Sequence, residues 1–236
     1  LLRGAGRYTD DFALPGMLWL AVVRSPHAHA RIARIDIGDA ARIPGVAAVL
    51  TRAELPALAG SVPPLVPAPE FHPYHHPVLA AGRVTHAGEA VAVVVAESPY
   101  IAADAVESVR VEYEPLPAAA TVEAALAPGA PRVHESWPGN LAGVSESGTG
   151  SVDDGFARAD AVVEMRLYYP RVAGMPIEPR AVLASHDPAT GLLTAWLSTQ
   201  VPFAVRSAIA GVLGMAEEHV RVIAPEVGGG FGVKGH

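Results

Sequence analysis

Four glycines surround one phenylalanine near the carboxyl end of the chain, in the stretch GGGFG formed by residues 228–232. Glycines this dense lose much conformational freedom on folding and pack no side chain, so they mark a backbone that must bend or lie against a bulky neighbour. The overlapping stretch 230–235, GFGVKG, has the spacing of a dinucleotide-binding loop, but the helix and acidic residue that complete that motif would fall beyond residue 236. Val233 rather than glycine precedes Lys234, which excludes a Walker loop. The residues alone leave a cofactor-binding loop and a structural turn equally open.

The histidines suggest a metal-site hypothesis, since imidazole is a common zinc ligand. Two groups are closely spaced: His27 with His29, and His72 with His75 and His76 in a proline-rich stretch. His27 and His29 would share one face of a strand without a third ligand, and no histidine or acidic set recurs at the spacing of a zinc site. We therefore expect no metal ion that is ligated directly by the protein.

The pairs of adjacent aspartates are also poor candidates for catalytic residues. Asp10–Asp11 and Asp153–Asp154 are adjacent, so their carboxylates would point apart on a strand, and such pairs more often serve turns or helix starts. The chain has no cysteine, which excludes disulfides, thiolate zinc sites, a cysteine nucleophile and iron–sulfur ligation within these residues. We assign no catalytic residue in this chain.

The composition indicates a packed protein of one large or two ordinary domains. The chain has 236 residues, of which 50% are hydrophobic and 17% charged. Its net charge of -7 includes no compensating basic block, so nucleic acid is not an expected partner. The longest apolar run, AVAVVVA at 90–96, is far too short for a membrane span and lies between Glu89 and Glu97. No signal peptide is visible, and we expect a cytoplasmic location.

The first predicted unit spans residues 1–118. Short strands at 17–24 and 31–37 and a short helix and strand within 38–50 precede the proline-rich loop at 56–77, which holds seven prolines. A long buried strand is predicted at 90–96. A helix follows it, with Ser98 as its cap and Pro99 in its first turn, and the strand 109–117 closes the unit.

Residues 119–150 are rich in Ala, Pro, Gly and Ser and are predicted to form a connector. The second unit, residues 151–236, begins after it. Its predicted elements are the strands 159–169, 181–187 and 192–198, the helix 202–214 and the strand 219–227, which leads into the glycine stretch.

Both units resemble one family. The stretches GRYTDDFALPGMLWLAVVRSPHAHARI (6–32) and VTHAGEAVAVVVAESPYIAADAVESVRVEYEPLPA (84–118) resemble the a/b hammerhead domain of the xanthine dehydrogenase and aldehyde oxidase family. MPIEPRAVLA (175–184), STQVPFAVRSAIAGVLGM (198–215) and VRVIAPEVGGGFGVKG (220–235) are similar to the start of its molybdopterin-binding domain, as in aerobic carbon monoxide dehydrogenase large subunits. The resemblance implies an α+β fold: a hammerhead domain followed by the first, incomplete portion of a mixed α+β molybdopterin-binding domain.

The resemblance also implies a site. In this family the GGGFG loop lies against a molybdopterin-type molybdenum cofactor, and the backbone N–H at the phenylalanine position, here Phe231, can donate toward an oxygen on molybdenum. Gly229, Gly230 and Gly232 would keep the backbone close to the cofactor, and Gln200 of the TQ pair would lie near the same oxygen. Glu178 matches a recurrent family motif, but its flanking prolines suggest turn architecture, so we assign it no catalytic role.

The implied protein is an oxidoreductase, the large subunit of a molybdenum hydroxylase. It would hydroxylate a small-molecule substrate, an aldehyde, an N-heterocycle or carbon monoxide, with oxygen derived from water. Electrons would pass to an iron–sulfur small subunit and a FAD-binding medium subunit. Purine-oxidising members carry a glutamate directly after the loop lysine, where this chain has Gly235, so xanthine is a less expected substrate.

The sequence leaves an alternative open: a truncated or split, non-catalytic module that serves subunit assembly. In relatives the catalytic glutamate lies much nearer the end of the subunit, and no residue here matches it. The chain also has no cysteine for a carbon monoxide dehydrogenase-type loop. The chain alone is therefore expected to be inactive.

Overall fold

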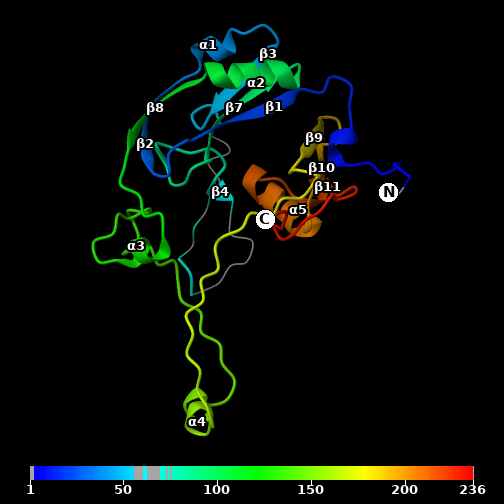
Figure 1. Ribbon diagram of the computed structural model, residues 1–236. Coiled ribbons are helices and arrows are strands. Elements are labelled where there is room, and N and C mark those ends of the chain that lie inside the picture. Colours follow the sequence, from blue (N-terminus) through cyan, green and yellow to red (C-terminus); the bar gives the residue numbers. More distant parts are fainter. Residues whose placement is uncertain (1–2, 56–60, 63–69, 73, 75, 236) are drawn as a thin grey trace.

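The structure, a computed structural model, describes residues 3–55, 61–62, 70–72, 74 and 76–235 (Figure 1). Within these residues it contains three three-stranded sheets, one pair of two-residue strands and several short helices, which confirms the predicted α+β class. Two of the larger sheets lie in the amino-terminal half and one in the carboxy-terminal half. No helix in this described part of the chain is both long and apolar enough to cross a membrane.

The first sheet is built around the predicted buried strand. Its order is β1 (Trp19–Arg24), β7 (Ala90–Ala96) and β3 (Val46–Thr51), and both pairings are antiparallel. Four of the seven residues of β7 are buried because the strand is central and covered on both faces. The strand predicted at 90–96 is confirmed.

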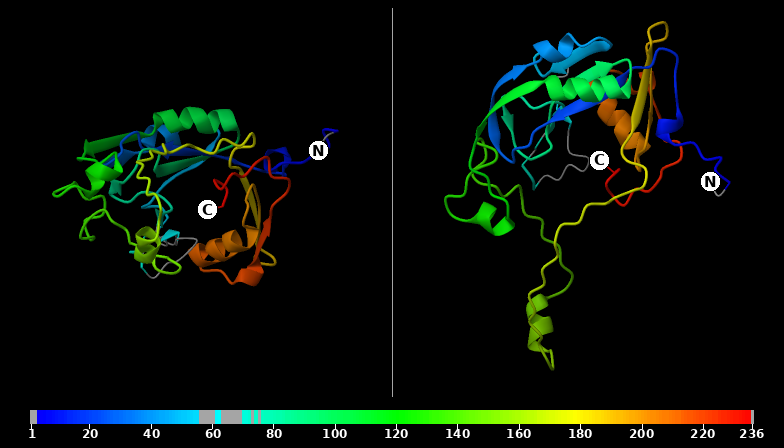
Figure 2. Two further views of the ribbon diagram at one scale, coloured as in Figure 1. Left: turned by 60° about the horizontal axis from the view of Figure 1, so that its bottom comes forward. Right: turned by 45° about the horizontal axis from the view of Figure 1, so that its top comes forward.

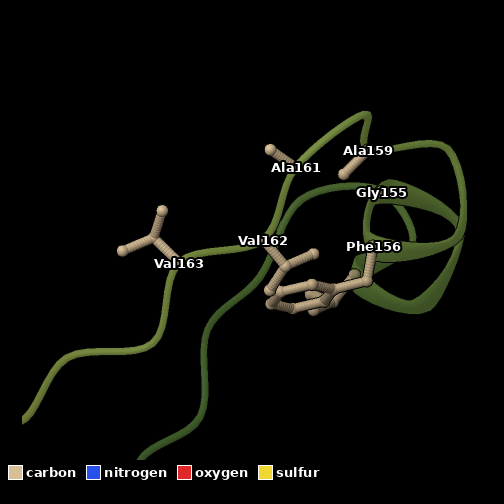
Figure 3. A pocket seen from close by; sticks show the side chains of 7 residues that line it. Gly155, Phe156, Ala159, Ala161, Val162 and Val163 are labelled. Atoms are coloured by element: carbon tan, nitrogen blue, oxygen red, sulfur yellow. The ribbon is translucent and has the colours of Figure 1, made fainter.

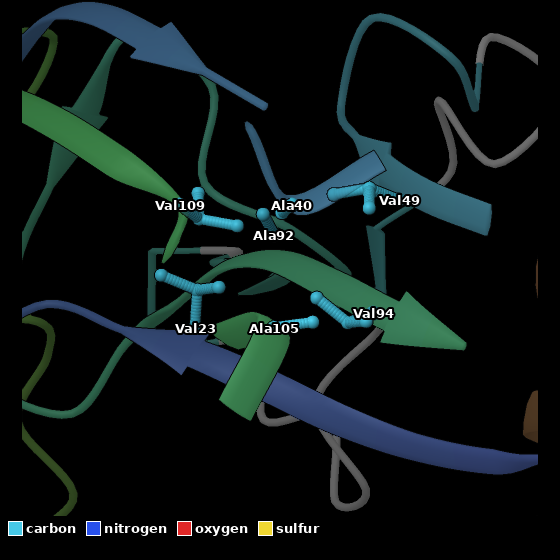
Figure 4. Close-up of a cluster of buried hydrophobic side chains, with 7 residues drawn as sticks. All are labelled: Val23, Ala40, Val49, Ala92, Val94, Ala105 and Val109. Carbon is cyan, nitrogen blue, oxygen red and sulfur yellow. The ribbon is translucent and has the colours of Figure 1, made fainter. Parts of the chain in front are cut away.

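Helix α2 (Pro99–Ser108) packs on this sheet, together with the short helix α1 (Gly38–Ala41). The predicted cap is present, since the Ser98 Oγ accepts a hydrogen bond from the Ile101 N–H at 3.2 Å. Small and β-branched side chains fill the space between helix and strands (Figure 4): Val23, Ala40, Val49, Ala92, Val94, Ala105 and Val109. The close approach of α2 to the sheet follows from its buried alanines.

The second sheet has the order β6 (Arg83–Val84), β2 (Ala30–Asp36) and β8 (Arg110–Pro115), again antiparallel. Most of the predicted proline-rich loop lies outside the described residues. Its described ends form the pair of β4 (Ser61–Val62) and β5 (His76–Pro77), and Phe71 forms a β-bridge with Gly143. The proline-rich stretch and the residues after β8 therefore touch.

The residues between β8 and α4 contain the short helix α3 (Val122–Leu126). Asn140 organises this stretch, because its Nδ2 donates to the carbonyls of Ala125 and Pro131 and its Oδ1 accepts from the Val133 N–H. Helix α4 (Val152–Ala157) follows, with Asp153 and Asp154 in its first turn. Asp10 and Asp11 lie in a 3-10 turn, η1 (Thr9–Asp11), so both acidic pairs lie where the sequence predicted, at helix starts.

The third sheet carries the glycine stretch. Strand β10 (Leu192–Leu197) is central, antiparallel to β9 (Val182–Asp187) and parallel to β11 (Val220–Ile223), and α5 (Pro202–Leu213) connects the parallel pair and packs against β11 (Figure 2). Helix α5 ends at Gly214, whose φ of 64° is the left-handed conformation typical of a helix stop. The last predicted strand, 219–227, is longer than the observed one. Strand β11 ends two residues before Pro225, which lacks the N–H that a further sheet hydrogen bond would need.

The segment before β1 lies on this third sheet. Phe12 stacks on Trp196 of β10 with 6.5 Å between ring centroids, and the Arg7 guanidinium lies 4.3 Å from the Phe12 ring centroid. Two hydrogen bonds join Arg7 to Glu226 after β11: the Arg7 N–H donates to the Glu226 carboxylate at 2.6 Å, and the Glu226 N–H donates to the Arg7 carbonyl at 3.3 Å. The first residues of the chain thus support the loop that leads into the glycine stretch.

The strand predicted at 159–169 is wrong. The structure has no strand there, and the apolar positions of its alternating pattern, Val163, Met165, Leu167 and Tyr169, are 61–83% exposed. A strand needs backbone partners from a neighbouring strand. None of the described residues supplies them, and in Figure 1 this stretch returns from α4 toward the third sheet without joining a sheet.

This exposure gives a direct prediction for limited proteolysis. Trypsin should cleave the folded chain first after Arg158, Arg166 or Arg171, because these residues are exposed and lie outside strands. Arg24 of β1 and Arg110 of β8 serve as internal controls, since their backbones are paired in sheets. Mass spectrometry of the earliest fragments decides the matter: first cleavage after Arg24 or Arg110 would contradict the fold.

Candidate functional site

The predicted site residues meet at one edge of the third sheet, where the parallel strands β10 and β11 both end. Carboxyl ends of parallel strands open at the same edge of a sheet. After β10 the chain continues through Ser198 and Thr199, which are buried, to Gln200, which is exposed. The Gln200 N–H and the Thr199 hydroxyl both donate to the Lys234 carbonyl, at 3.0 and 3.2 Å. The end of β10 and the glycine stretch are therefore tied together.

The Gln200 carboxamide has a defined orientation. Its Oε1 accepts a hydrogen bond from the Gly232 N–H at 3.0 Å, which assigns the other end of the group as the NH₂. Gly230 provides the space: a Cβ there would lie 2.5 Å from the Gln200 Cδ. A side chain at position 230 would push Gln200 out of this place. Gln200 is exposed, and no described residue accepts a hydrogen bond from its NH₂, which is thus left as a donor beside the loop.

The glycine loop, residues 228–232, turns in the left-handed region of backbone conformation. Phe231 has a φ of 52°, the only positive value of a non-glycine residue among the described residues, and Gly229 and Gly232 have values of 100° and 82°. Such a φ at a bulky residue is uncommon and persists only where its surroundings hold it. Two turn hydrogen bonds follow, from Val233 to Gly230 and from Gly235 to Gly232.

These turns leave three consecutive backbone N–H groups, those of Gly229, Gly230 and Phe231, without an acceptor among the described residues. Successive N–H groups in such a conformation form a concave donor surface that suits anionic and oxygen-rich groups. The Gln200 NH₂ adds a side-chain donor beside them. The donor set fits an oxygen-rich cofactor and does not fit a bare cation, which needs acceptors.

Beneath the loop lies a buried carboxylate, Glu178, which the sequence suggested only as part of a turn. Its Oε2 accepts hydrogen bonds from the Ser198 hydroxyl at 2.5 Å, the Gly228 N–H at 2.7 Å and the Lys234 Nζ at 3.0 Å. Its Oε1 accepts a longer bond, 3.4 Å, from the Thr9 N–H. Burial by itself would raise the pKa of Glu178, but these hydrogen bonds outweigh it and lower the pKa to about 2.

Lys234 is the matching buried cation. It is the only lysine in the sequence, all other basic residues being arginine, and its side chain is fully buried against Glu178. Two sequence signals could have marked this pair: the lone lysine inside a glycine stretch and the match of Glu178 to a recurrent family motif. The four partners of Glu178 come from three separate parts of the chain, which no local pattern connects: Thr9, Ser198, and the glycine stretch with Gly228 and Lys234.

The packing around Gly228 can be tested by mutation. A Cβ at position 228 would lie 2.5 Å from the Glu178 Cβ, so Gly228→Ala should force Glu178 to move and destabilise the chain by about 1–3 kcal/mol. Gly211→Ala in α5 is the control, because a Cβ there meets nothing within 4 Å and alanine favours a helix by up to about 1 kcal/mol. Urea unfolding measures both. A Gly228→Ala chain as stable as the wild type would show that this packing is wrong.

The structure does not gather the histidines into a metal site. Among the residues that it describes, no group of three or more His, Asp or Glu side chains could hold a metal ion, and His75 lies outside them. His29 is buried, with its Nδ1 2.8 Å from the Pro117 carbonyl oxygen. His72 packs on Trp137 and His76 packs on Tyr74, where burial lowers the pKa of His76. Of these, His72 joins the proline-rich stretch to the residues after β8, whereas the contact of His76 with Tyr74 lies within that stretch.

Two pockets lie among the described residues. The larger, of about 290 Å³, lies between α4 and the residues after it (Figure 3), and all its lining residues are apolar or glycine, so it offers no group for chemistry: Val152, Gly155, Phe156, Ala159, Ala161, Val162 and Val163. The second, of about 210 Å³, lies beside the glycine loop and includes Arg180, Thr199 and Lys234 in its lining. Of these two pockets, the second adjoins the predicted site.

Comparison with known proteins gives an independent view of these residues. Residues 3–117 match the family model described as aldehyde oxidase and xanthine dehydrogenase, a/b hammerhead domain, and residues 133–236 match that of the molybdopterin cofactor-binding domain. The carbon monoxide dehydrogenase large chain of Hydrogenophaga pseudoflava is 38% identical over 254 residues, which cover 99% of this chain and 30% of that protein. The nicotine 6-hydroxylase large subunit of Paenarthrobacter nicotinovorans is 37% identical over 237 residues, covering 100% of this chain and 29% of that protein.

Among solved structures, quinoline 2-oxidoreductase from Pseudomonas putida 86 superposes with a TM-score of 0.91 at 39% identity, over 99% of this chain and 30% of that chain. The chain therefore spans about 30% of the length of these three relatives. The two family models together cover the hammerhead elements and the glycine loop, and the relatives match along almost the whole chain. The chain belongs to the xanthine dehydrogenase, aldehyde oxidase and carbon monoxide dehydrogenase family of molybdopterin-binding large subunits.

Proposed function

We propose that this chain is the part of a molybdenum hydroxylase large subunit that contacts the molybdenum cofactor with Gln200 and residues 229–232. One observation carries the proposal: three consecutive N–H groups that have no acceptor among the described residues lie beside the Gln200 carboxamide, whose NH₂ is left as a donor. The match of residues 133–236 to the molybdopterin cofactor-binding domain supports it. When bound, this cofactor supplies a two-electron redox centre.

The chain's own residues have binding and orienting roles in this proposal. The N–H groups of Gly229, Gly230 and Phe231 donate toward the cofactor, and the φ of 52° at Phe231 holds its N–H in that direction. Gln200 donates through its NH₂, while its Oε1 stays bonded to Gly232. Pre-oriented donors of this kind stabilise developing negative charge because they need no reorganisation during the reaction.

The proposed overall reaction adds an oxygen atom from water to a substrate carbon and releases two electrons and two protons. The substrate classes are an aldehyde, an N-heterocycle or carbon monoxide; the names of the relatives, which include carbon monoxide, nicotine and quinoline enzymes, support this range. Gly235 in place of the glutamate of purine-oxidising members argues against xanthine. We assign no general base in this chain, so the chain alone should not turn over.

The proposal includes partner subunits. Relatives named as large chains or large subunits support assembly with other polypeptides, for which we propose an iron–sulfur small subunit and a FAD-binding medium subunit. The cytoplasmic location stays a prediction that cell fractionation would test.

A second candidate function is a non-catalytic module for subunit assembly. The exposed apolar side chains of residues 161–177 favour it, because a contiguous exposed apolar stretch of this kind commonly marks a surface that another polypeptide covers. The two candidate functions differ in cofactor content, because the hydroxylase subunit requires bound molybdenum cofactor and the assembly module would bind none.

The test is to express the complete large subunit together with its partner subunits. The molybdenum content of the complex and its reduction of an artificial electron acceptor are then measured. The proposed function predicts close to stoichiometric molybdenum and reduction of an artificial electron acceptor with an aldehyde, an N-heterocycle or carbon monoxide. The separate 236-residue chain should give no turnover. An assembled complex that lacks molybdenum would favour the assembly module, and steady turnover by the separate chain would contradict the absence of a base.

A further inference from the structure

We propose that Glu178 is a positioning residue for the glycine loop: its carboxylate, paired with Lys234, fixes the direction of the N–H groups of residues 229–231 and the place of Gln200. The effect on the loop is a property of this chain alone. Its consequence for the cofactor rests on the proposed function.

The contacts of Glu178 hold both ends of the loop. Its Oε2 accepts from the Gly228 N–H at 2.7 Å, where the loop begins, and from the Lys234 Nζ at 3.0 Å, just after the loop ends. Hydrogen bonds to an ionised carboxylate are about twice as strong as neutral ones. One buried oxygen atom thereby closes the base of the loop and limits the turns that the residues between can adopt.

The same pair also places Gln200. Lys234, held by its side chain at Glu178, presents its backbone carbonyl to the Gln200 N–H at 3.0 Å and to the Thr199 hydroxyl at 3.2 Å. Ser198, two residues before Gln200, donates its hydroxyl to the same Glu178 oxygen at 2.5 Å. The Glu178 carboxylate therefore holds in place both the glycine loop and Gln200, the residue that faces the loop.

The burial of the Glu178–Lys234 ion pair indicates that the two charges have a role other than stabilising the fold. The Lys234 side chain is fully buried and that of Glu178 is 8% exposed. A buried ion pair often contributes no more to stability than apolar residues of the same size, because both charges lose their hydration. Its distinctive property is directional: the carboxylate offers several acceptor positions at one point, which an apolar pair cannot do.

Hydrogen exchange of the 236-residue chain tests the role at the loop. In Glu178→Gln the amides of this stretch that donate hydrogen bonds, those of Gly228, Gly232, Val233 and Gly235, should exchange at least about tenfold faster. The reason is that one neutral acceptor oxygen replaces a carboxylate whose Oε2 alone accepts from three donors. Glu217→Gln is the matched control, because Glu217 pairs with Arg206 at the surface of the same half of the chain. As a second readout, Lys234 is the sole lysine, so its acetylation reports access to this one side chain and should be slow in the wild type and fast in Glu178→Gln.

The double variant Glu178→Gln with Lys234→Met separates positioning from stability. It removes the unpaired buried charge, so its melting temperature should return close to that of the wild type while loop exchange stays raised. In the assembled enzyme, molybdenum content should be low in Glu178→Gln and in the double variant alike.

Two results would overturn the proposal: wild-type loop exchange in Glu178→Gln, or a double variant that regains both melting temperature and loop protection. Wild-type molybdenum content in a Glu178→Gln enzyme with a loosened loop would overturn the part that concerns the cofactor. If the wild-type assembly binds no molybdenum, the proposed function fails, and loop exchange alone decides the positioning role.

Discussion

Replacing Gln200 with glutamate should lower the turnover of the assembled enzyme about a hundredfold while its melting temperature stays within a few degrees of the wild type. The substituted carboxylate can still accept the hydrogen bond from the Gly232 N–H, so the loop keeps this contact. It has no NH₂ to donate, and its negative charge opposes an oxygen-rich cofactor. Because Gln200 is exposed, the change should cost little stability.

Gln200→Ala provides the comparison. It removes both the donor and the acceptor, so the Gly232 N–H loses its partner and amide exchange at Gly232 should also rise. Steady-state kinetics and molybdenum analysis of both variants check the prediction. Full turnover by Gln200→Glu with molybdenum bound would show that the NH₂ of Gln200 has no part in the reaction.

Removing one partner of the Glu178–Lys234 pair should destabilise the chain by about 3–5 kcal/mol, because the remaining charge is left buried without a counterion. Lys234→Met shows this most cleanly, since methionine is apolar and similar in length. Urea unfolding at neutral pH measures the change. A loss of less than about 1 kcal/mol would place the pair with ordinary surface ion pairs.

The same pair predicts the acid sensitivity of the wild-type chain. The pKa of Glu178 is about 2 in the folded chain, below its ordinary value of 4.5. The carboxylate therefore contributes stability that is fully present above about pH 4.5 and is lost as the pH falls toward 2, about 3 kcal/mol in total. In Glu178→Gln this part of the pH dependence should be absent, whereas Glu217→Gln should keep it.

Local sequence patterns predicted the helices and strands that are determined by residues close together in the sequence. The buried strand β7 and helix α2 follow from an apolar run and from Ser98 and Pro99 at the helix start, and both are where the sequence predicted. The strand at 159–169 had an equally clear alternating pattern but failed, since a strand depends on a neighbour that the pattern itself does not contain.

The site was predictable in part, through the resemblance to a known family and not from spacing. The resemblance of the TQ pair and the glycine stretch indicated Gln200 and residues 229–232, and the structure brings these together. The sequence did not show why residue 230 must be glycine. The reason is that the side chain of Gln200, 30 residues earlier in the chain, occupies the space where a Cβ would lie. Nor did it show the role of Glu178, whose partners Thr9, Ser198, Gly228 and Lys234 are joined only by the fold.

The central claim is that the glycine loop and Gln200 lie against a molybdenum cofactor. Anomalous X-ray diffraction from crystals of the assembled protein, collected on both sides of the molybdenum absorption edge, tests it most directly. We predict one strong molybdenum peak for each large subunit, on the side of the loop where the N–H groups of residues 229–231 and the Gln200 NH₂ point. A fully occupied molybdenum peak in the same subunit that contacts neither Gln200 nor residues 229–232 would contradict the account.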